Sequence, residues 1–384
     1  MAITFTSIPD EIARSRTPLW FEAESDAVGL VKIRFELYKL DEYELIFKTV
    51  NLQVDNDGKA RYNFSKVITD QLGKNVPVLG GGLTGNADAN AVFKYYVRAV
   101  NIVDGVETLT ANSFIRYAIF GDHSFFLQEP QYLPIDTSKT YLWLTAKPLE
   151  RELYINQEEI ATVLFTEDVG APVLFTKVYY RDGTTSELST VEVTTDLDDH
   201  LEGTIRHFDF SFREQAWNEL AESAKEVIRI EIKITGAGVT GDTLIYNVQP
   251  QRSAEMRSYI FRNKRGGFDS FAATGNLAEK EATEGEVYLI DNKYTGIKQK
   301  PEVIVYSQNS GWLPKAEAGA YGQMRRINNA WLVLNSVQLA SITIQPGTTD
   351  MPDDIGNVYA FTMDYTFGDG RFDFETINAI EFAG

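Results

Sequence analysis

The feature that most constrains the fold is a two-residue alternation of apolar and polar side chains that recurs along the chain. It is clearest at residues 228–234, where isoleucine alternates with arginine, glutamate and lysine, and it recurs at residues 31–38 and 93–100. Alternate residues of a strand face opposite sides of a sheet, so this pattern predicts half-buried strands. Asp57-Gly58 and Asp182-Gly183 follow such runs and predict tight hairpin turns, because glycine readily adopts a positive φ. The sequence therefore predicts a mainly β protein.

Helices are expected at few positions. Apolar residues spaced by four predict a short helix over residues 64–72. A second helix is predicted from Ser211, because Glu214 three residues later completes a capping box. A third is predicted after residues 312–314, where a proline suits a first helical turn.

A short pattern occurs twice and indicates an internal repeat. Residues 61–65 and 206–211 both read as an aromatic-polar-aromatic strand end that leads into a serine. A strand-like run precedes each copy and another follows it, whereas residues 17–21 have a looser counterpart at 140–144. Chance similarity is the alternative, and we favour duplication because repetition builds length and surface in structural proteins.

The length and the repeat together predict the domain organisation. A chain of 384 residues is too long for one compact core. We expect two tandem β-sandwich domains, each with one crossing helix, at residues 1–125 and 126–255. A C-terminal α+β domain is expected at residues 256–384.

Composition excludes several classes of function. The chain has 36 Lys and Arg against 55 Asp and Glu, a net charge of -19, so nucleic acid and anionic membranes are unfavourable partners. It has no cysteine, which excludes disulfides, thiolate nucleophiles and cysteine-based metal sites. No signal peptide is visible, and no apolar run approaches the roughly 18 residues that span a bilayer. We therefore expect synthesis in the cytoplasm and no membrane insertion.

Sequence matches to ligand-binding loops lack the context that binding requires. Residues 80–85 fit GxGxxG, but a nucleotide site needs a helix directly after it, and a strand is predicted instead. Residues 55–58 hint at a calcium loop, but the spacing lacks the carboxylates that such a loop needs. We expect a flexible loop at the first and a hairpin turn at the second.

No catalytic constellation emerges from the sequence. The densest group of possible metal ligands is an acidic loop near His207, which we expect to be solvated, with His207 itself packed in a strand. Neither G-x-S-x-G nor HExxH occurs, although glycosidase-like carboxylate pairs remain open. We expect no enzyme activity, no cofactor and no bound metal. The acidic loop contains Asp196, Asp198, Asp199, His200 and Glu202.

Tryptophans are the other residues that suggest a ligand, because exposed indoles suit sugar binding. Each of the five lies in an apolar pattern, so packing in a core is expected for all of them. They are Trp20, Trp143, Trp217, Trp312 and Trp331.

Residues 259–271 carry a family resemblance. Two aromatic runs flank a polar, glycine-bearing turn, which predicts a hairpin, and the stretch reads aromatic-Asn-x-x-Gly-Gly-aromatic-Asp-x-Phe from Phe261. It resembles virion proteins encoded by phages and prophages of Bacteroidetes. Similar features are the segments 16–22, 96–99, 180–183, 311–313 and 333–336, whereas residues 272–300 have no counterpart. The resemblance implies a structural role in the tail or baseplate and no catalytic residues.

The expected function is therefore that of a phage virion protein of the tail, made in the host cytoplasm. It would form homo-oligomers and dock to other virion tail proteins through loops and hairpins. The alternative is a carbohydrate-binding module or a surface adhesin. The candidate contact residues are Phe261, Asn263, Lys264, Arg265, Gly266, Gly267, Phe268, Gly80, Gly81 and Gly82.

Overall fold

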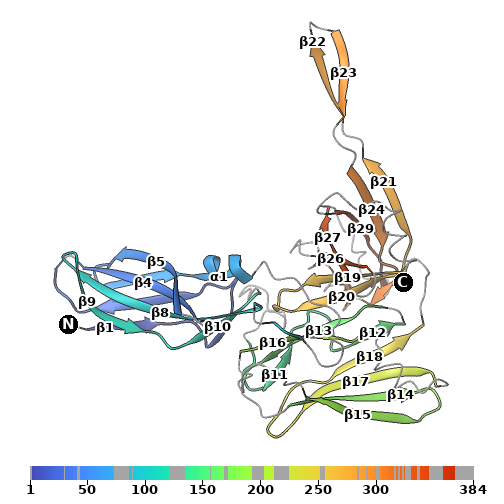
Figure 1. Cartoon of the computed structure of the whole chain (residues 1–384), viewed down its shortest axis with the longest axis horizontal. Helices are drawn as coiled ribbons and strands as arrows, with labels where there is room; N and C mark the ends of the chain where they lie inside the picture. The colour runs from blue at the N-terminus through green and yellow to red at the C-terminus, as the bar shows by residue number, and fades with distance from the viewer. Residues whose placement is uncertain are drawn as a thin grey trace.

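The fold is mainly β, as the alternation predicts, and its strands form three modules (Figure 1). The computed structural model describes residues 2–29, 31–40, 44–72, 86–88, 90–121, 135–155, 157–167, 172–192, 203–211, 225–250, 256–282, 285–290, 293–299, 303–314, 317–318, 321, 324, 330–334, 338–345 and 358–367.

The first module (described residues between 2 and 121) packs a small sheet against a large one. The small sheet has the order β1 (Ile3–Ser7), β3 (Trp20–Ser25), β6 (Lys59–Asn63). The large sheet has the order β2 (Ile12–Arg14), β10 (Arg116–Ile119), β8 (Val92–Val103), β4 (Val31–Leu40), β5 (Glu44–Gln53), and β9 (Val106–Asn112) also pairs with β8. Phe21 and Ala23 of one sheet share a core with Phe35 and Tyr95 of the other.

The second module (described residues between 135 and 250) is built in the same way. Its small sheet has the order β11 (Tyr141–Trp143), β13 (Ile160–Phe165), β16 (Ile205–Asp209), and β7 (Asn86–Ala87) from the preceding stretch joins its edge. Its large sheet has the order β12 (Glu150–Tyr154), β18 (Leu244–Gln249), β17 (Val227–Thr235), β14 (Val173–Tyr180), β15 (Thr185–Glu192).

The two modules share one topology. In both, the first, third and sixth strands along the chain form the small sheet. In both large sheets, the strands that come first and last along the chain, β2 with β10 and β12 with β18, are neighbours and pair in parallel. Both modules are therefore β-sandwiches of the same topology. The strand ends at 61–65 and 206–211 occupy equivalent positions in β6 and β16, as the repeat predicts. The looser match of 17–21 with 140–144 is wrong, because the first segment enters β3 and the second forms β11.

The third module (described residues between 256 and 367) is a single large sheet. Its order is β20 (Phe268–Ala273), β19 (Arg257–Arg262), β26 (Ala330–Leu334), β27 (Gln338–Ile344), β29 (Thr362–Phe367), β24 (Val303–Asn309), β21 (Leu277–Ala282). A short pair, β25 (Leu313–Pro314) with β28 (Val358–Tyr359), lies beside it.

A two-stranded arm extends from the third module. It consists of β22 (Gly285–Ile290) and β23 (Lys293–Gln299), which continue the chain between β21 and β24. Figure 1 shows the arm projecting away from all three modules, and no strand of the described part pairs with its outer edges.

The helix predictions meet different outcomes. α1 (Ser65–Leu72) is confirmed, with Ile68 and Leu72 buried against the first core. The helix expected from Ser211 lies outside the described residues. After residue 314 the described positions 317, 318, 321 and 324 are helical, whereas Pro314 itself belongs to β25 and not to a first helical turn.

The alternation is confirmed, with one local exception. Ile230, Ile232 and Ile234 are buried, but Ile228 is 40% exposed. The pairing of β14 with β17 shifts register between Tyr179 and Tyr180, and Val227 takes the inward position instead. A one-residue irregularity exchanges the two faces of a strand, which explains why the periodicity alone misplaces Ile228.

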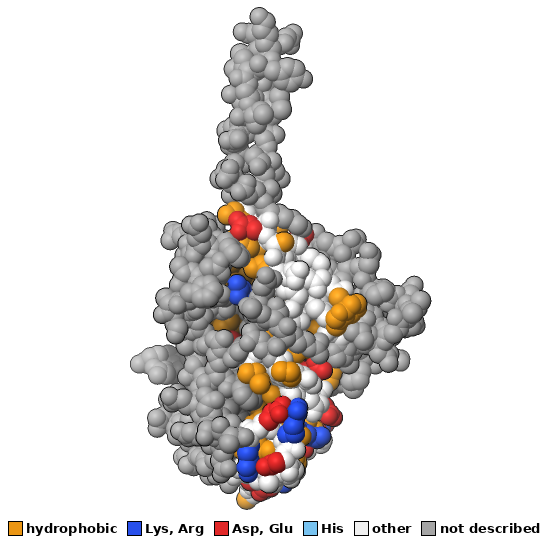
Figure 2. Space-filling model, turned by 90° about the vertical axis from the view of Figure 1, so that its right-hand side faces the viewer, with side chains coloured by type: hydrophobic (Ala, Val, Ile, Leu, Met, Phe, Trp, Pro, Cys, Tyr) orange, Lys and Arg blue, Asp and Glu red, His pale blue; other side chains and the backbone are white. Residues whose placement is uncertain are grey.

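The surface carries no single apolar face in the view of Figure 2. Its hydrophobic side chains form separate small groups, and acidic and basic side chains are mixed at the lower end. Figure 1 places β14 to β18 at that end, where Arg229 pairs with Glu231 at 2.9 Å and Lys177 with Glu187 at 2.6 Å. In the part of the chain that the structure describes, no helix is long and apolar enough to cross a membrane.

Candidate functional site

The β19–β20 hairpin forms as the sequence predicts, and Asn263 shapes its turn. The Oδ1 atom of Asn263 accepts hydrogen bonds from the backbone of Arg265 and Gly267, at 2.9 and 3.2 Å. Gly266 has a φ of 103°, a conformation that favours glycine. The turn is therefore rigid and pre-shaped by its own side chain and glycine.

One side of this turn contacts the first module. Arg262 donates from Nη1 to the carbonyl oxygen of Leu72 at 2.6 Å, and its guanidinium lies 4.0 Å from the ring centroid of Phe120. The backbone of Gly266 also lies against the first module, because a Cβ atom at this position would collide with the carbonyl oxygen of Phe120. Burial lowers the pKa of Arg262 to about 10, so the guanidinium is charged at neutral pH and needs these partners.

The other side of the hairpin contacts the second module. Asn263 donates from Nδ2 to the carbonyl oxygen of Leu144 at 2.7 Å. Asp269 accepts from Oγ1 of Thr145 at 2.5 Å and from the backbone of Ala146 at 2.8 Å. The backbone of Phe268 donates to Oγ1 of Thr162 at 2.9 Å.

A buried ion network extends this second contact. Glu159, fully enclosed, pairs with Arg151 at 2.8 Å and with Lys147 at 3.5 Å, and accepts hydrogen bonds from Tyr246 and Ser270. Burial, the largest contribution, would raise the pKa of Glu159, but Lys147 and Arg151 together hold it below its ordinary value. Burial raises the pKa of the Tyr246 phenol well above its ordinary range. The network therefore joins β12, β18 and the residue that precedes β13 in the second module to β20 of the third.

Two apolar clusters also lie between modules, one between the first and the second and one between the second and the third. One buried cluster combines Ile12 and Ile119 of the first module with Leu164 and Ile205 of the second. Another combines Ile160 of the second module with residues of the third, namely Ile260, Phe268, Trp331 and Val333. Strands β13, β16, β20 and β26 are consequently buried along their whole lengths, and β19 is buried except at Arg257, since both of their faces are covered.

His207 lies in this junction, packed as predicted. Its Nε2 atom is 2.9 Å from Oδ2 of Asp88, and its Nδ1 atom is 3.0 Å from Oγ1 of Thr162. The ring meets Phe268 edge to face, and His207 is only 2% exposed. This Thr-His-Asp row resembles a catalytic triad in composition, but His207 and Thr162 are buried in the junction. Its role is to tie the segment after β7 to β16.

The predicted contact residues therefore have intramolecular partners. Phe261, Asn263, Gly266, Gly267 and Phe268 are buried. Lys264 and Arg265 are half-buried, and a contact with another copy stays a prediction for the whole set. The loop with Gly80, Gly81 and Gly82 lies outside the described residues, as do His123 and the acidic loop of residues 196–202.

Among the described residues, no group of three or more His, Asp and Glu could hold a metal ion.

The tryptophan prediction is partly wrong. Trp143 and Trp331 are buried, whereas Trp20 is 40% and Trp312 is 65% exposed. Trp20 begins β3 on the outward face, under the guanidinium of Arg61 at 4.7 Å. Trp312 lies in the connection between β24 and β25, where strand alternation does not apply. Trp217 lies outside the described residues.

Sequence reasoning missed the residues that carry the junction. Arg262 lies inside the predicted hairpin, but no neighbouring residue in the sequence indicates that it is buried, and Arg151 and Glu159 have no local signal either. One signal was available: β20 contains Asp269 and Ser270 in an otherwise apolar strand. Polar residues inside an apolar strand indicate buried partners.

Comparison with known proteins adds little. No family model matches the chain, and no curated protein matches it. Among solved structures the chain is similar to one titled "Crystal structure of CBD12 from CALX1.2", with a TM-score of 0.21 and 8% identity, over 65% of this chain and 99% of that one. A likeness at this level carries no argument about function.

Proposed function

We propose that the chain is a non-enzymatic structural protein of a bacteriophage particle, associated with the tail, which acts by docking to copies of itself and to other tail proteins. The resemblance at residues 261–271 supports the particle assignment. The physical support is independent of it and comes from the arm and from the junctions.

The observation that carries the proposal is the projecting arm. β22 and β23 pair only with each other among the described strands, away from the three cores. A lone two-stranded hairpin is marginally stable in water. A surface of a neighbouring subunit that covers the arm would stabilise it, and a hairpin held out from the body is well shaped for such a contact.

The junctions support the same role. Hydrogen bonds, buried ions and one apolar cluster fix the first and second modules to β19 and β20 of the third, and a second apolar cluster joins the first module directly to the second. An assembly component must hold its contact surfaces at fixed spacing, because a closed ring or tube forms only at one geometry. Modules that are fixed to each other by buried contacts can hold their contact surfaces at such a fixed spacing.

Mass spectrometry of density-purified phage particles, from the culture that encodes the gene, tests the proposal. The chain should co-purify with the particles at a stoichiometry of several copies per particle. Its absence from particles, together with a strictly monomeric state of the purified protein, would refute the assignment.

A further inference from the structure

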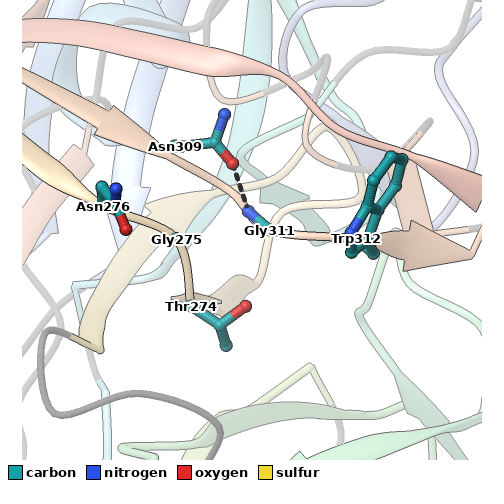
Figure 3. A pocket seen from close by; sticks show the side chains of 6 residues that line it. All are labelled: Thr274, Gly275, Asn276, Asn309, Gly311 and Trp312. Atoms are coloured by element: carbon teal, nitrogen blue, oxygen red, sulfur yellow. Dashed lines mark hydrogen bonds between the residues drawn. The ribbon is translucent and has the colours of Figure 1, made fainter.

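An open pocket of about 500 Å³ lies at one end of the third module, between the start of β21 and the end of β24. Two chain segments form it, residues 274–276 and residues 309–312 (Figure 3). The lining residues are Thr274, Gly275, Asn276, Asn309, Gly311 and Trp312.

The floor of the pocket is rigid backbone. Gly275 donates to the carbonyl oxygen of Asn309 at 3.1 Å, and Asn309 donates back to that of Asn276 at 3.0 Å. A Cβ on Gly275 would lie 2.6 Å from Oδ1 of Asn309, so only glycine lets the two segments come this close. Gly311 has a φ of 72° and donates to Oδ1 of Asn309 at 2.8 Å. The pocket is therefore formed before any ligand arrives.

The side chains around this floor combine one flat apolar surface with amides. Trp312 is 65% exposed, and its ring has no aromatic or cationic partner among the described residues. Asn276 is exposed and its side-chain amide has no hydrogen-bond partner in the described part of the chain. Asn309 already accepts from Gly311 through Oδ1, and its Nδ2 atom makes only a long contact to Oγ1 of Thr362, at 3.4 Å.

Charge is absent from the lining, although the whole protein carries a net charge of -19. An ionic ligand would find no counter-charge here and would lose hydration without compensation. The pocket therefore favours a neutral molecule with one apolar face and several groups that both donate and accept hydrogen bonds.

We propose that this pocket binds one pyranose ring of a neutral glycan. The C–H face of the sugar would lie on the indole of Trp312, and its hydroxyls would bond to the amide of Asn276 and to Nδ2 of Asn309. An amide offers both a carbonyl acceptor and an N–H donor, which suits a hydroxyl. The inference concerns a surface separate from the arm and holds whether or not the protein enters a particle.

Titration of the isotope-labelled full chain with methyl glycosides of glucose, galactose, mannose and N-acetylglucosamine tests the site by indole NMR. At least one sugar should shift the Trp312 resonance saturably. Trp312→Ala should weaken binding by about tenfold or more, and Asn276→Ala by about three- to tenfold through loss of a hydrogen bond. Trp20→Ala is the matched control, since Trp20 is also exposed but lies in the first module, and it should bind as the wild type does.

Two outcomes would overturn the proposal. One is that no sugar shifts Trp312 more than it shifts Trp20, or that Trp312→Ala binds with unchanged affinity. The other is a Trp312 resonance that responds to protein concentration and not to sugar, which would assign the ring to a contact between copies. All three variants remove exposed side chains, so the fold is expected to be retained.

Discussion

Arg262, the last residue of β19, donates a hydrogen bond to the carbonyl oxygen of Leu72, the last residue of α1, at 2.6 Å across 190 positions of sequence. The last carbonyls of a helix have no partner within it, and its C-terminus carries partial negative charge. The third module thus supplies the cation that satisfies a helix end of the first. This contact couples the stability of one module to the position of another.

Replacing Arg262 by methionine should lower the apparent free energy of unfolding by about 2 kcal/mol or more, because a desolvated cation–π contact and a charged hydrogen bond are lost together. Chemical denaturation followed by tryptophan fluorescence measures it. Arg61→Met is the matched control, since its guanidinium lies over the exposed Trp20, and it should cost less than about 1 kcal/mol. Equal effects of the two changes would contradict the bracing role of Arg262.

Gly266→Ala should open the junction between the first and third modules. Alanine at Gly183 serves as the control, because that glycine has a φ of 84° and open space around it, whereas Gly266 faces the carbonyl oxygen of Phe120. Gly183→Ala should lower the free energy of unfolding by about 1 to 2 kcal/mol, because alanine is strained at a left-handed φ. Gly266→Ala should lower it by about 1 to 3 kcal/mol more, because the added methyl group clashes with the carbonyl oxygen of Phe120. Small-angle scattering should show a larger radius of gyration for Gly266→Ala alone. An unchanged radius would argue that the turn does not fix the modules.

The buried carboxylate of Glu159 should give a pH-dependent mutant effect. Its pKa is depressed in the folded state, so its contribution to stability is complete above the unfolded value of about 4.3 and is lost as pH falls through the folded value. Glu159→Gln should therefore lower the free energy of unfolding by about 3 to 5 kcal/mol at neutral pH, since it leaves the buried cations of Arg151 and Lys147 without a carboxylate partner. The difference from the wild type should start to shrink below about pH 4.3, where Glu159 of the unfolded chain protonates, and should be lost below the lower pKa of the folded state.

Denaturation of both proteins across pH 3 to 7 measures this difference. Glu226→Gln is the control, because Glu226 forms an exposed pair with Arg181, and such a pair is worth less than about 1 kcal/mol. A mutant cost that stays constant down to the lowest pH would show that the charge of Glu159 does not stabilise the fold.

Removing the arm should abolish self-association without unfolding the chain. A variant in which residues 284–299 are replaced by a two-glycine turn keeps β21 and β24 paired, because their ladder lies outside the deletion. Sedimentation velocity should show a monomer, whereas the wild type should form larger species at rising concentration. Val106→Ser, at the exposed tip of the β8–β9 hairpin, should behave as the wild type does. Identical profiles for all three proteins would rule out the arm as a contact.

Local patterns predicted the strands, the Asp-Gly turns and α1, because each depends on neighbours a few residues away. Gly58, Gly105 and Gly183 have positive φ values of 77°, 85° and 84°, as Asp-Gly turns require. The hairpin at residues 259–271 was recognisable for the same reason.

The partners of that hairpin were not predictable locally. Arg262 meets Leu72, Asn263 meets Leu144, and Ser270 meets Glu159 only after the modules have packed. A polar turn in isolation reads as solvated, and its burial depends on groups more than a hundred positions away. Trp312 shows the converse, since an apolar neighbourhood in sequence did not place its ring in a core.

Cryo-electron microscopy of the phage particles tests the central claim most directly. The account predicts repeated copies of this chain in the tail, with the three modules arranged around β19 and β20 as they are here and with β22 and β23 covered by a neighbouring subunit. Particles that lack the chain, or copies whose modules are separated and whose arm meets only solvent, would contradict it.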